Sequence, residues 1–182
     1  MTIGRTRLLA VAVAVAAVMA ATAASSAAAM GEGDNGNSVS VGLTGFQEDP
    51  LVISTTGNGE FRAQVDEASQ EIAYTLSYAD LEGSVLQAHI HIGGRAQSGG
   101  ISVFLCSNLG NGPAGTQLCP AAPATITGTI RPADVIGPVG QGVTAGQFNE
   151  LVAAFRAGTT YVNVHSTVQP GGEIRAQLDH DH

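Results

Sequence analysis

Three histidines of the chain stand in two short apolar stretches. His89 and His91 belong to AHIHIGG, at residues 88–94, and His165 belongs to YVNVHS, at residues 161–166. Neutral imidazole nitrogens bind Zn²⁺ or Cu²⁺ at about 2.0 Å, and three protein ligands leave one coordination position open. If the two stretches are neighbours in the fold, these histidines predict a Cu or Zn site.

A β-strand is the element that would position these side chains, because residues two apart on a strand point to the same face. His89 and His91 should then lie opposite Ala88 and Ile90. If GEIRAQL, at residues 172–178, forms a further neighbouring strand, six polar residues share one face: His89, His91, Asn163, His165, Glu173 and Arg175. The prediction is that the three histidines bind the metal and that the other three residues surround them.

A structural role is the alternative for the same residues. A His-x-His pair on a strand can hydrogen-bond to neighbouring strands, to loop carbonyls or to a carboxylate such as Glu173, and Glu173 can pair with Arg175 on the sheet face. His180 and His182, in the terminal DHDH, are separated from the domain by a tail and would bind stray metal only weakly. The metal site and the structural cluster therefore both remain open hypotheses.

Residues 1–29 are typical of a secretory signal peptide. Arg5 and Arg7 precede an apolar run at residues 8–20, and small residues with Ala-x-Ala sites follow. A membrane anchor is the alternative, but the run is short for a span, which needs about 20 residues. We therefore expect a secreted, extracellular protein without a membrane span.

The predicted mature chain is acidic. Removing 29 of the 182 residues leaves 153, with five arginines, no lysine and all 15 acidic residues. This length suits one domain with its own core. The negative charge repels nucleic acid and anionic lipid and tolerates metal ions, so we expect no nucleic-acid partner.

Two cysteines, Cys106 and Cys119, lie in the predicted mature chain with 12 residues between them. In an exported protein an even pair is most simply a disulfide. The intervening loop is rich in Gly, Asn and Pro and has few apolar residues to hold it, which favours a covalent link. A metal or redox role fits less well because the spacing is not Cys-x-x-Cys and two thiols alone make a poor zinc site.

Eight short segments alternate in polarity or are rich in β-branched residues, and turns separate them. They cover residues 38–46, 59–66, 71–81, 86–92, 101–106, 124–130, 161–166 and 172–178. Many short strands of period two predict an all-β fold, an antiparallel β-sandwich or barrel with Greek-key-like connections.

One segment, TAGQFNELVAAFRAG, has apolar residues at helical spacing instead. It predicts a helix at about residues 145–157, before the last two strands, with Thr144 and Gln147 as a capping box and Gly158 at its end.

Several motifs in this order resemble the CHRD domain, a module named from chordin that also occurs in exported bacterial proteins. They are GFQEDP, YTLSYADLEG, AHIHIGG, ELVAAFRAGTTYVNVHS and PGGEIRAQL. The family often has Val-Pro-Pro after the Gln-Glu pair, where this chain has Asp49-Pro50. The resemblance implies an extracellular β-domain over residues 39–178 and no established catalytic residues. A tether at residues 30–38 and a tail at 179–182 would flank the domain.

Three functional hypotheses follow. The first is a non-enzymatic extracellular binding module for a protein or cell-surface ligand, which is the role the resemblance implies. The second is a Cu- or Zn-binding protein that uses the three histidines. The third is redox activity at that metal, because a His-x-His strand beside a lone strand histidine looks like the copper half of copper–zinc superoxide dismutase.

Overall fold

The computed structural model of the chain describes Met1 and residues 36–179. Apart from Met1, the predicted signal peptide lies outside the described residues. The tail histidines His180 and His182 and most of the predicted tether also lie outside them.

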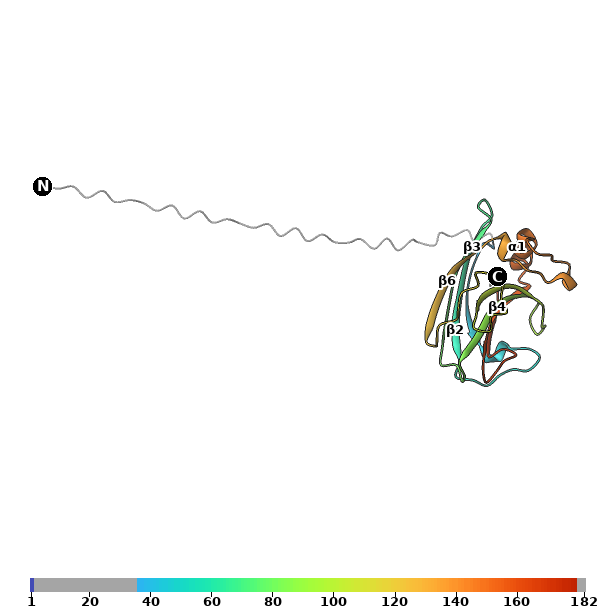
Figure 1. Cartoon of the computed structure of the whole chain (residues 1–182), viewed down its shortest axis with the longest axis horizontal. Helices are drawn as coiled ribbons and strands as arrows, with labels where there is room; N and C mark the ends of the chain where they lie inside the picture. The colour runs from blue at the N-terminus through green and yellow to red at the C-terminus, as the bar shows by residue number, and fades with distance from the viewer. Residues whose placement is uncertain (2–35, 180–182) are drawn as a thin grey trace. The chain divides into compact units, whose positions relative to one another are not determined.

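Within residues 36–179 the chain forms eight strands in one antiparallel sheet, so the all-β prediction is confirmed. The strands are β1 (Ser38–Thr44), β2 (Asn58–Asp66), β3 (Glu71–Ala79), β4 (Val85–Ile92), β5 (Ile101–Ser107), β6 (Ala124–Ile130), β7 (Thr160–Ser166) and β8 (Ile174–Gln177). Their order is β5-β4-β7-β8-β1-β2-β3-β6, and the sheet curls into a nearly closed barrel (Figure 1). Strands distant in sequence are neighbours at β4–β7, β8–β1 and β3–β6, as in Greek-key folds.

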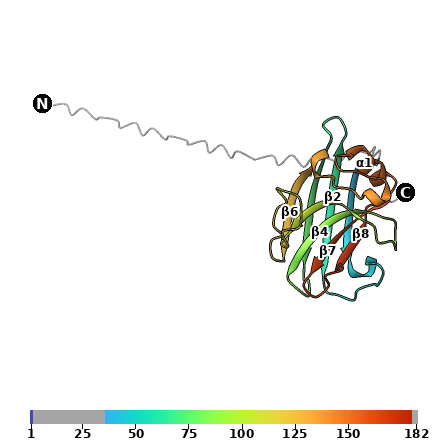
Figure 2. The same ribbon diagram turned by 45° about the vertical axis from the view of Figure 1, so that its right-hand side comes forward.

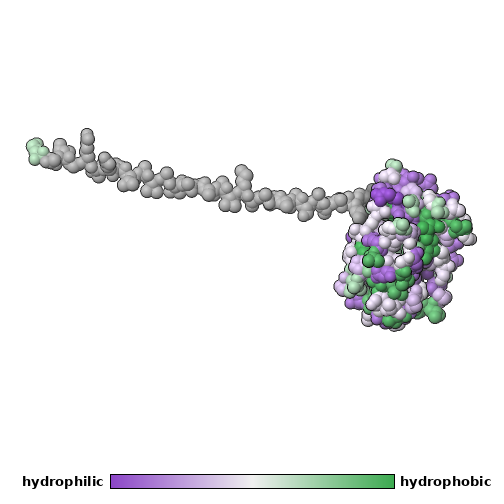
Figure 3. Space-filling model, viewed as in Figure 1, coloured by the Kyte–Doolittle hydropathy of each residue, from purple (hydrophilic) through white to green (hydrophobic). Residues whose placement is uncertain are grey.

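The two halves of the sheet differ in what covers their outer face. In β2 and β3 the inward residues such as Phe61 and Leu76 are buried, whereas Arg62 and Gln64 on the outer face of β2 are exposed. Figure 3 shows polar and apolar side chains interspersed over the visible surface of the domain. Every residue of β7 and β8, by contrast, is buried. Something other than solvent therefore covers the outer face of these two strands.

The helix α1 (Phe148–Arg156) packs its apolar residues inward, as predicted, but begins three residues later than expected. Gly146 has φ +85°, a left-handed conformation that interrupts a helix, and the Gln147 side chain accepts a hydrogen bond from the Thr144 backbone N–H at 2.6 Å. The predicted capping contact thus closes a turn before the helix. Gly158 ends the helical region with φ +64°. Among the described residues no helix is long and apolar enough to cross a membrane.

A disulfide joins Cys106 on β5 to Cys119, as predicted. The loop that it closes carries Gln117, whose Nε2 lies 3.1 Å from the Leu105 carbonyl of β5 and 3.3 Å from the Thr127 carbonyl of β6. The same atom donates to the Tyr74 hydroxyl at 2.9 Å. Since β5 and β6 are the two ends of the strand order, Gln117 bridges the seam of the barrel.

Candidate metal centre

The pairing of β4 with β7 brings the three predicted histidines together. His89 lies opposite Asn163, His91 opposite Tyr161, and His165 opposite Gln87. Figure 2 shows β4, β7 and β8 side by side on one wall of the barrel. One ligand atom from each imidazole can be chosen so that all three lie within 4.8 Å of one another. His89 Nδ1 and His165 Nε2 are 3.2 Å apart.

The cluster lies on the outer face of the sheet but is shielded from solvent. Ala88 and Ile90 of the same strand belong to the hydrophobic core, so the histidines project the opposite way, as their alternation predicts. Nevertheless His89 is 0% exposed and His91 and His165 are each 7% exposed. The covering comes from the segments after β4 and after β7, whose backbone carbonyls hydrogen-bond to the imidazoles.

These carbonyls determine which ring nitrogens carry hydrogen. His91 Nδ1 lies 2.9 Å from the Gly99 carbonyl oxygen, and His165 Nδ1 lies 3.0 Å from the Pro170 carbonyl oxygen. A carbonyl can only accept, so both Nδ1 atoms donate and both Nε2 atoms of the neutral rings keep their lone pairs. The Nε2 atoms of His89 and His91 are buried and have no hydrogen-bond partner among the described residues.

Burial keeps the imidazoles neutral. It lowers the pKa of His89 to about 3, with a further contribution from the neighbouring histidines. It lowers the pKa of His91 to about 4 against the opposing effect of the Gly99 hydrogen bond, and it also lowers the pKa of His165. All three rings are therefore in their metal-binding form at neutral pH.

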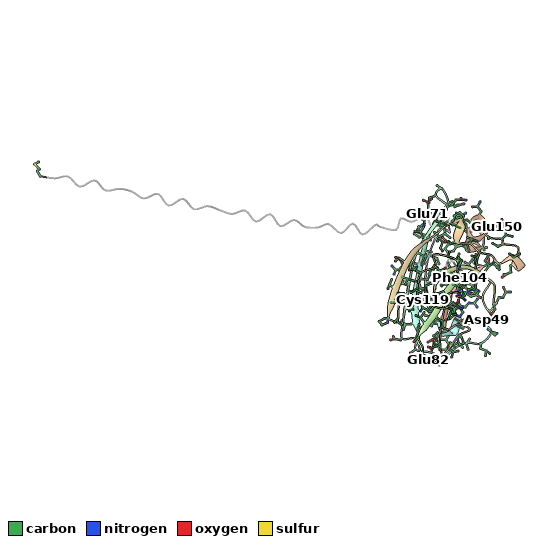
Figure 4. All side chains as sticks on the ribbon, viewed as in Figure 1. Asp49, Glu71, Glu82, Phe104, Cys119 and Glu150 are labelled. Carbon is green, nitrogen blue, oxygen red and sulfur yellow. A yellow bond between two sulfur atoms is a disulfide. The ribbon has the colours of Figure 1, made fainter. Side chains whose placement is uncertain are left out.

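Aromatic side chains fix two of the three rings. The Phe104 ring meets the His89 ring edge-on at 4.4 Å between centroids, and Figure 4 places Phe104 midway between the two ends of the barrel. The Tyr161 ring stacks on His91 at 4.7 Å and 6° between planes. The guanidinium carbon of Arg175 lies 3.5 Å from the centroid of Tyr161. Little rotational freedom remains for the imidazoles.

Two of the three predicted surrounding residues lie beside the cluster. The side-chain amide of Asn163 lies 3.1 Å from His165 Nε2. Arg175 is 2% exposed, and its Nη2 donates to the carbonyl oxygens of Gly94 at 3.0 Å and Gln97 at 3.2 Å. Arg175 therefore holds the segment after β4 over the histidines.

Glu173 does not form the ion pair with Arg175 that the sequence suggested. Its Oε1 accepts hydrogen bonds from the Thr55 hydroxyl and from the Glu82 backbone N–H, each at 2.7 Å. Among the described residues it has no salt bridge. The buried carboxylate instead links the segments after β1 and after β3, whose hydroxyl and backbone donors hydrogen-bond to it.

Glu48 is a buried acidic residue that sequence reasoning missed. It is 7% exposed, and its Oε1 has no hydrogen-bond partner among the described residues. Burial raises the pKa of Glu48 to about 7, although the charge of Arg175 acts in the opposite direction. A side chain on Gly172 would come within 2.6 Å of its carboxylate oxygens. The only sequence signal is an acidic residue in GFQEDP, which does not indicate burial.

The fold and the site define a class: a disulfide-linked antiparallel β-barrel domain with a buried polar cluster beneath its surface segments. Residues 39–178 match the CHRD domain family, so the chain belongs to that family. At the level of the family, membership supports an extracellular type of binding module. No curated protein and no solved structure matches the chain.

Proposed function

We propose that this protein is an exported CHRD-type binding module whose ligand is one Cu²⁺ or Zn²⁺ ion, held by His89, His91 and His165. The observation that carries the proposal is the convergence of three neutral imidazoles within 4.8 Å, in which two buried Nε2 atoms lack a hydrogen-bond partner among the described residues. An unpaired buried polar atom costs about 1–3 kcal/mol. A metal ion bound through an Nε2 atom would remove that cost at the atom it binds.

The surroundings of the rings support the proposal. Metal-binding histidines generally donate their second ring nitrogen to a carbonyl or carboxylate, which fixes the tautomer and the orientation. The Gly99 and Pro170 carbonyls have this role for His91 and His165. The contact between His89 Nδ1 and His165 Nε2, at 3.2 Å, keeps two of the rings close enough to share one ion.

The ligand types favour copper or zinc. Imidazole suits both ions, whereas magnesium and calcium prefer oxygen ligands. The thiols of Cys106 and Cys119 are used in the disulfide, so they do not compete for the ion. Copper binds nitrogen ligands more tightly than zinc does. Which of the two ions is available depends on the compartment to which the protein is exported.

Export is part of the proposal. The signal-peptide pattern at residues 1–29 supports it, and a disulfide persists in the oxidising conditions outside the cytoplasm. The other hypothesis from the sequence is a module for a protein or cell-surface ligand. A module of that kind would bind its ligand without metal, and its binding would be insensitive to loss of His89.

The test is metal analysis of protein exported to a bacterial periplasm and purified without an affinity tag. We expect one Cu²⁺ or Zn²⁺ per chain, or its uptake by calorimetric titration. His89→Ala should abolish stoichiometric binding. The matched control is the double variant His180→Ala/His182→Ala, which removes the other two histidines and should retain the ion. Equal binding by wild type and His89→Ala, or no uptake by wild type, would contradict the proposal.

A further inference from the structure

A cavity of about 150 Å³ lies in the seam of the barrel, between β5 and β6. Within residues 36–179 no strand pairing joins these two strands, because β5 pairs with β4 and β6 pairs with β3. Residues 103–105 of β5, residues 128–130 of β6 and the loop at residues 113–117 line the cavity. The proposed metal function makes no use of this space.

The body of the cavity is apolar and aromatic. Tyr74 and Phe104 line it together with Val103 and Ile130. A Cβ on Gly128 would lie 2.6 Å from the Tyr74 ring, so the glycine lets β6 pass close to that ring. An engineered apolar cavity of about this volume in another protein takes up benzene. The space between the two strands therefore suits a ligand with about one ring of carbon atoms.

Asp134 gives the cavity one charged wall. Its Oδ2 accepts a hydrogen bond from the Arg131 backbone N–H at 2.8 Å, but among the described residues the carboxylate forms no salt bridge. The Arg131 guanidinium pairs with Glu71 instead, at 2.8 Å. Burial raises the pKa of Tyr74 against the effect of its Gln117 hydrogen bond, and the charge of Asp134 raises it further. The carboxylate is therefore within electrostatic range of the Tyr74 hydroxyl.

The other polar groups of the cavity offer a ligand few free donors. Gln117 Nε2 already donates to the Tyr74 hydroxyl and to two strand carbonyls, and the Tyr74 hydroxyl donates to the Leu105 carbonyl at 3.2 Å. The Thr116 hydroxyl donates to the Pro113 carbonyl at 2.8 Å. An unpaired carboxylate beside occupied donors favours a ligand that is itself a donor. Aromatic rings also attract cations, as does the acidic predicted mature chain.

We propose that the seam cavity binds a small organic ammonium ion, with its apolar body between β5 and β6 beside Tyr74 and Phe104 and its cationic group at Asp134. A neutral molecule of the same shape lacks the charge-assisted hydrogen bond to the carboxylate and binds less tightly. The site needs no metal ion. It borders the histidine cluster only through Phe104, whose ring contacts His89.

The experiment titrates benzylamine, protonated at pH 7, into metal-free protein while amide NMR spectra are recorded. We expect a dissociation constant of about 1 mM or tighter, with the largest shifts at the amides of Phe104, Thr116 and Thr129. Benzyl alcohol, which is neutral and nearly the same shape, should bind about tenfold more weakly. Asp134→Asn should weaken benzylamine binding by a similar factor, the loss of a hydrogen bond to a charged group. The matched control Asp80→Asn, at an exposed acid beyond the other end of β3, should bind as wild type does.

The variants and the two ligands test the proposal independently. Asp134→Asn keeps an acceptor for the Arg131 N–H, so the turn after β6 is preserved. Equal affinity for benzylamine and benzyl alcohol, or equal benzylamine affinity in Asp134→Asn and Asp80→Asn, overturns the cation site. Absence of binding at about 10 mM benzylamine, or shifts confined to residues outside the seam, overturns it as well. Because the protein is metal-free, none of these results depends on the histidine cluster.

Discussion

The Nδ1 atom of His91 lies 2.9 Å from the carbonyl oxygen of Gly99, and this contact joins the candidate metal centre to the segment that covers it. The Tyr161 hydroxyl accepts a hydrogen bond from the Gly99 backbone N–H at 3.1 Å. One residue of the covering segment thus holds two rings of the site. The position has no room for a side chain, because a Cβ on Gly99 would lie 1.7 Å from the Ile92 carbonyl oxygen.

Gly99→Ala should therefore weaken metal binding without removing a ligand. The clash displaces the carbonyl that fixes the His91 tautomer, and loss of such a partner typically costs about 10–100-fold in metal affinity. Competition with a chromophoric chelator measures the change. Gly140→Ala is the matched control, because a Cβ there meets no atom within 4 Å. Equal affinity in the two variants would show that the Gly99 contact is irrelevant to binding.

The metal-free domain should lose stability as the pH falls from 7 to 5. The folded pKa values of His89 and His91 are about 3 and about 4, below the unfolded value of about 6.5. The unfolded state therefore binds more protons in this window, and the stabilisation that is present above pH 6.5 is lost on acidification. Each of these histidines contributes a loss of about 2 kcal/mol at pH 5. Urea unfolding at both pH values measures it, and unchanged or increased stability at pH 5 would contradict burial of neutral rings.

Glu48 should oppose this loss. Its folded pKa of about 7 lies above the ordinary value of 4.5, so it stabilises the folded state most fully below pH 4.5 and loses that effect as the pH rises through 7. Glu48→Gln should therefore make the loss between pH 7 and 5 larger by about 2 kcal/mol. Glu150→Gln, at an exposed position of α1, is the control and should follow the wild-type curve. A smaller loss of stability between pH 7 and 5 in Glu48→Gln than in wild type would contradict this prediction.

Replacing both Cys106 and Cys119 by serine should lower the free energy of unfolding by about 3 kcal/mol, from the loop entropy that the disulfide removes from the unfolded chain. Denaturant unfolding of the oxidised wild type and the double variant measures the difference. Reduced wild type provides an independent comparison and should resemble the double variant. A difference below about 1 kcal/mol would mean that the loop is held mainly by its hydrogen bonds.

The strands could be predicted from the sequence because their signal is local. The alternation of polar and apolar residues in GEFRAQVD or LQAHIHI indicates both the strand and the face of each side chain. The position of His91 opposite the core follows because successive side chains of a strand point to opposite faces. The start of α1 could not be predicted as well, because helical spacing does not reveal that Gly146 adopts a left-handed conformation.

The surroundings of the histidines depend on contacts between distant segments, which no local pattern encodes. The sequence suggested a Glu173–Arg175 pair because the two residues share a face, but Thr55 and Glu82 supply the hydrogen bonds to Glu173 instead. Glu48 gave no signal because its burial depends on the packing of the segment after β1 against Gly172. The convergence of the histidines depends on the pairing of β4 with β7. This pairing brings together His89 and His165, which are 76 positions apart in the chain.

The bridge that Gln117 makes between β5 and β6 also affects how molecules of this protein meet one another. Unpaired backbone groups at the margin of a sheet are templates on which strands of other chains can add, which is a route to aggregation. The Gln117 side chain hydrogen-bonds to one carbonyl on each of the two edge strands, β5 and β6. The disulfide between Cys106 and Cys119 holds the loop that carries Gln117 in this position. We therefore expect the disulfide to help protect solubility at high concentration, and a chain that fails to oxidise to offer β5 and β6 to neighbouring molecules more readily.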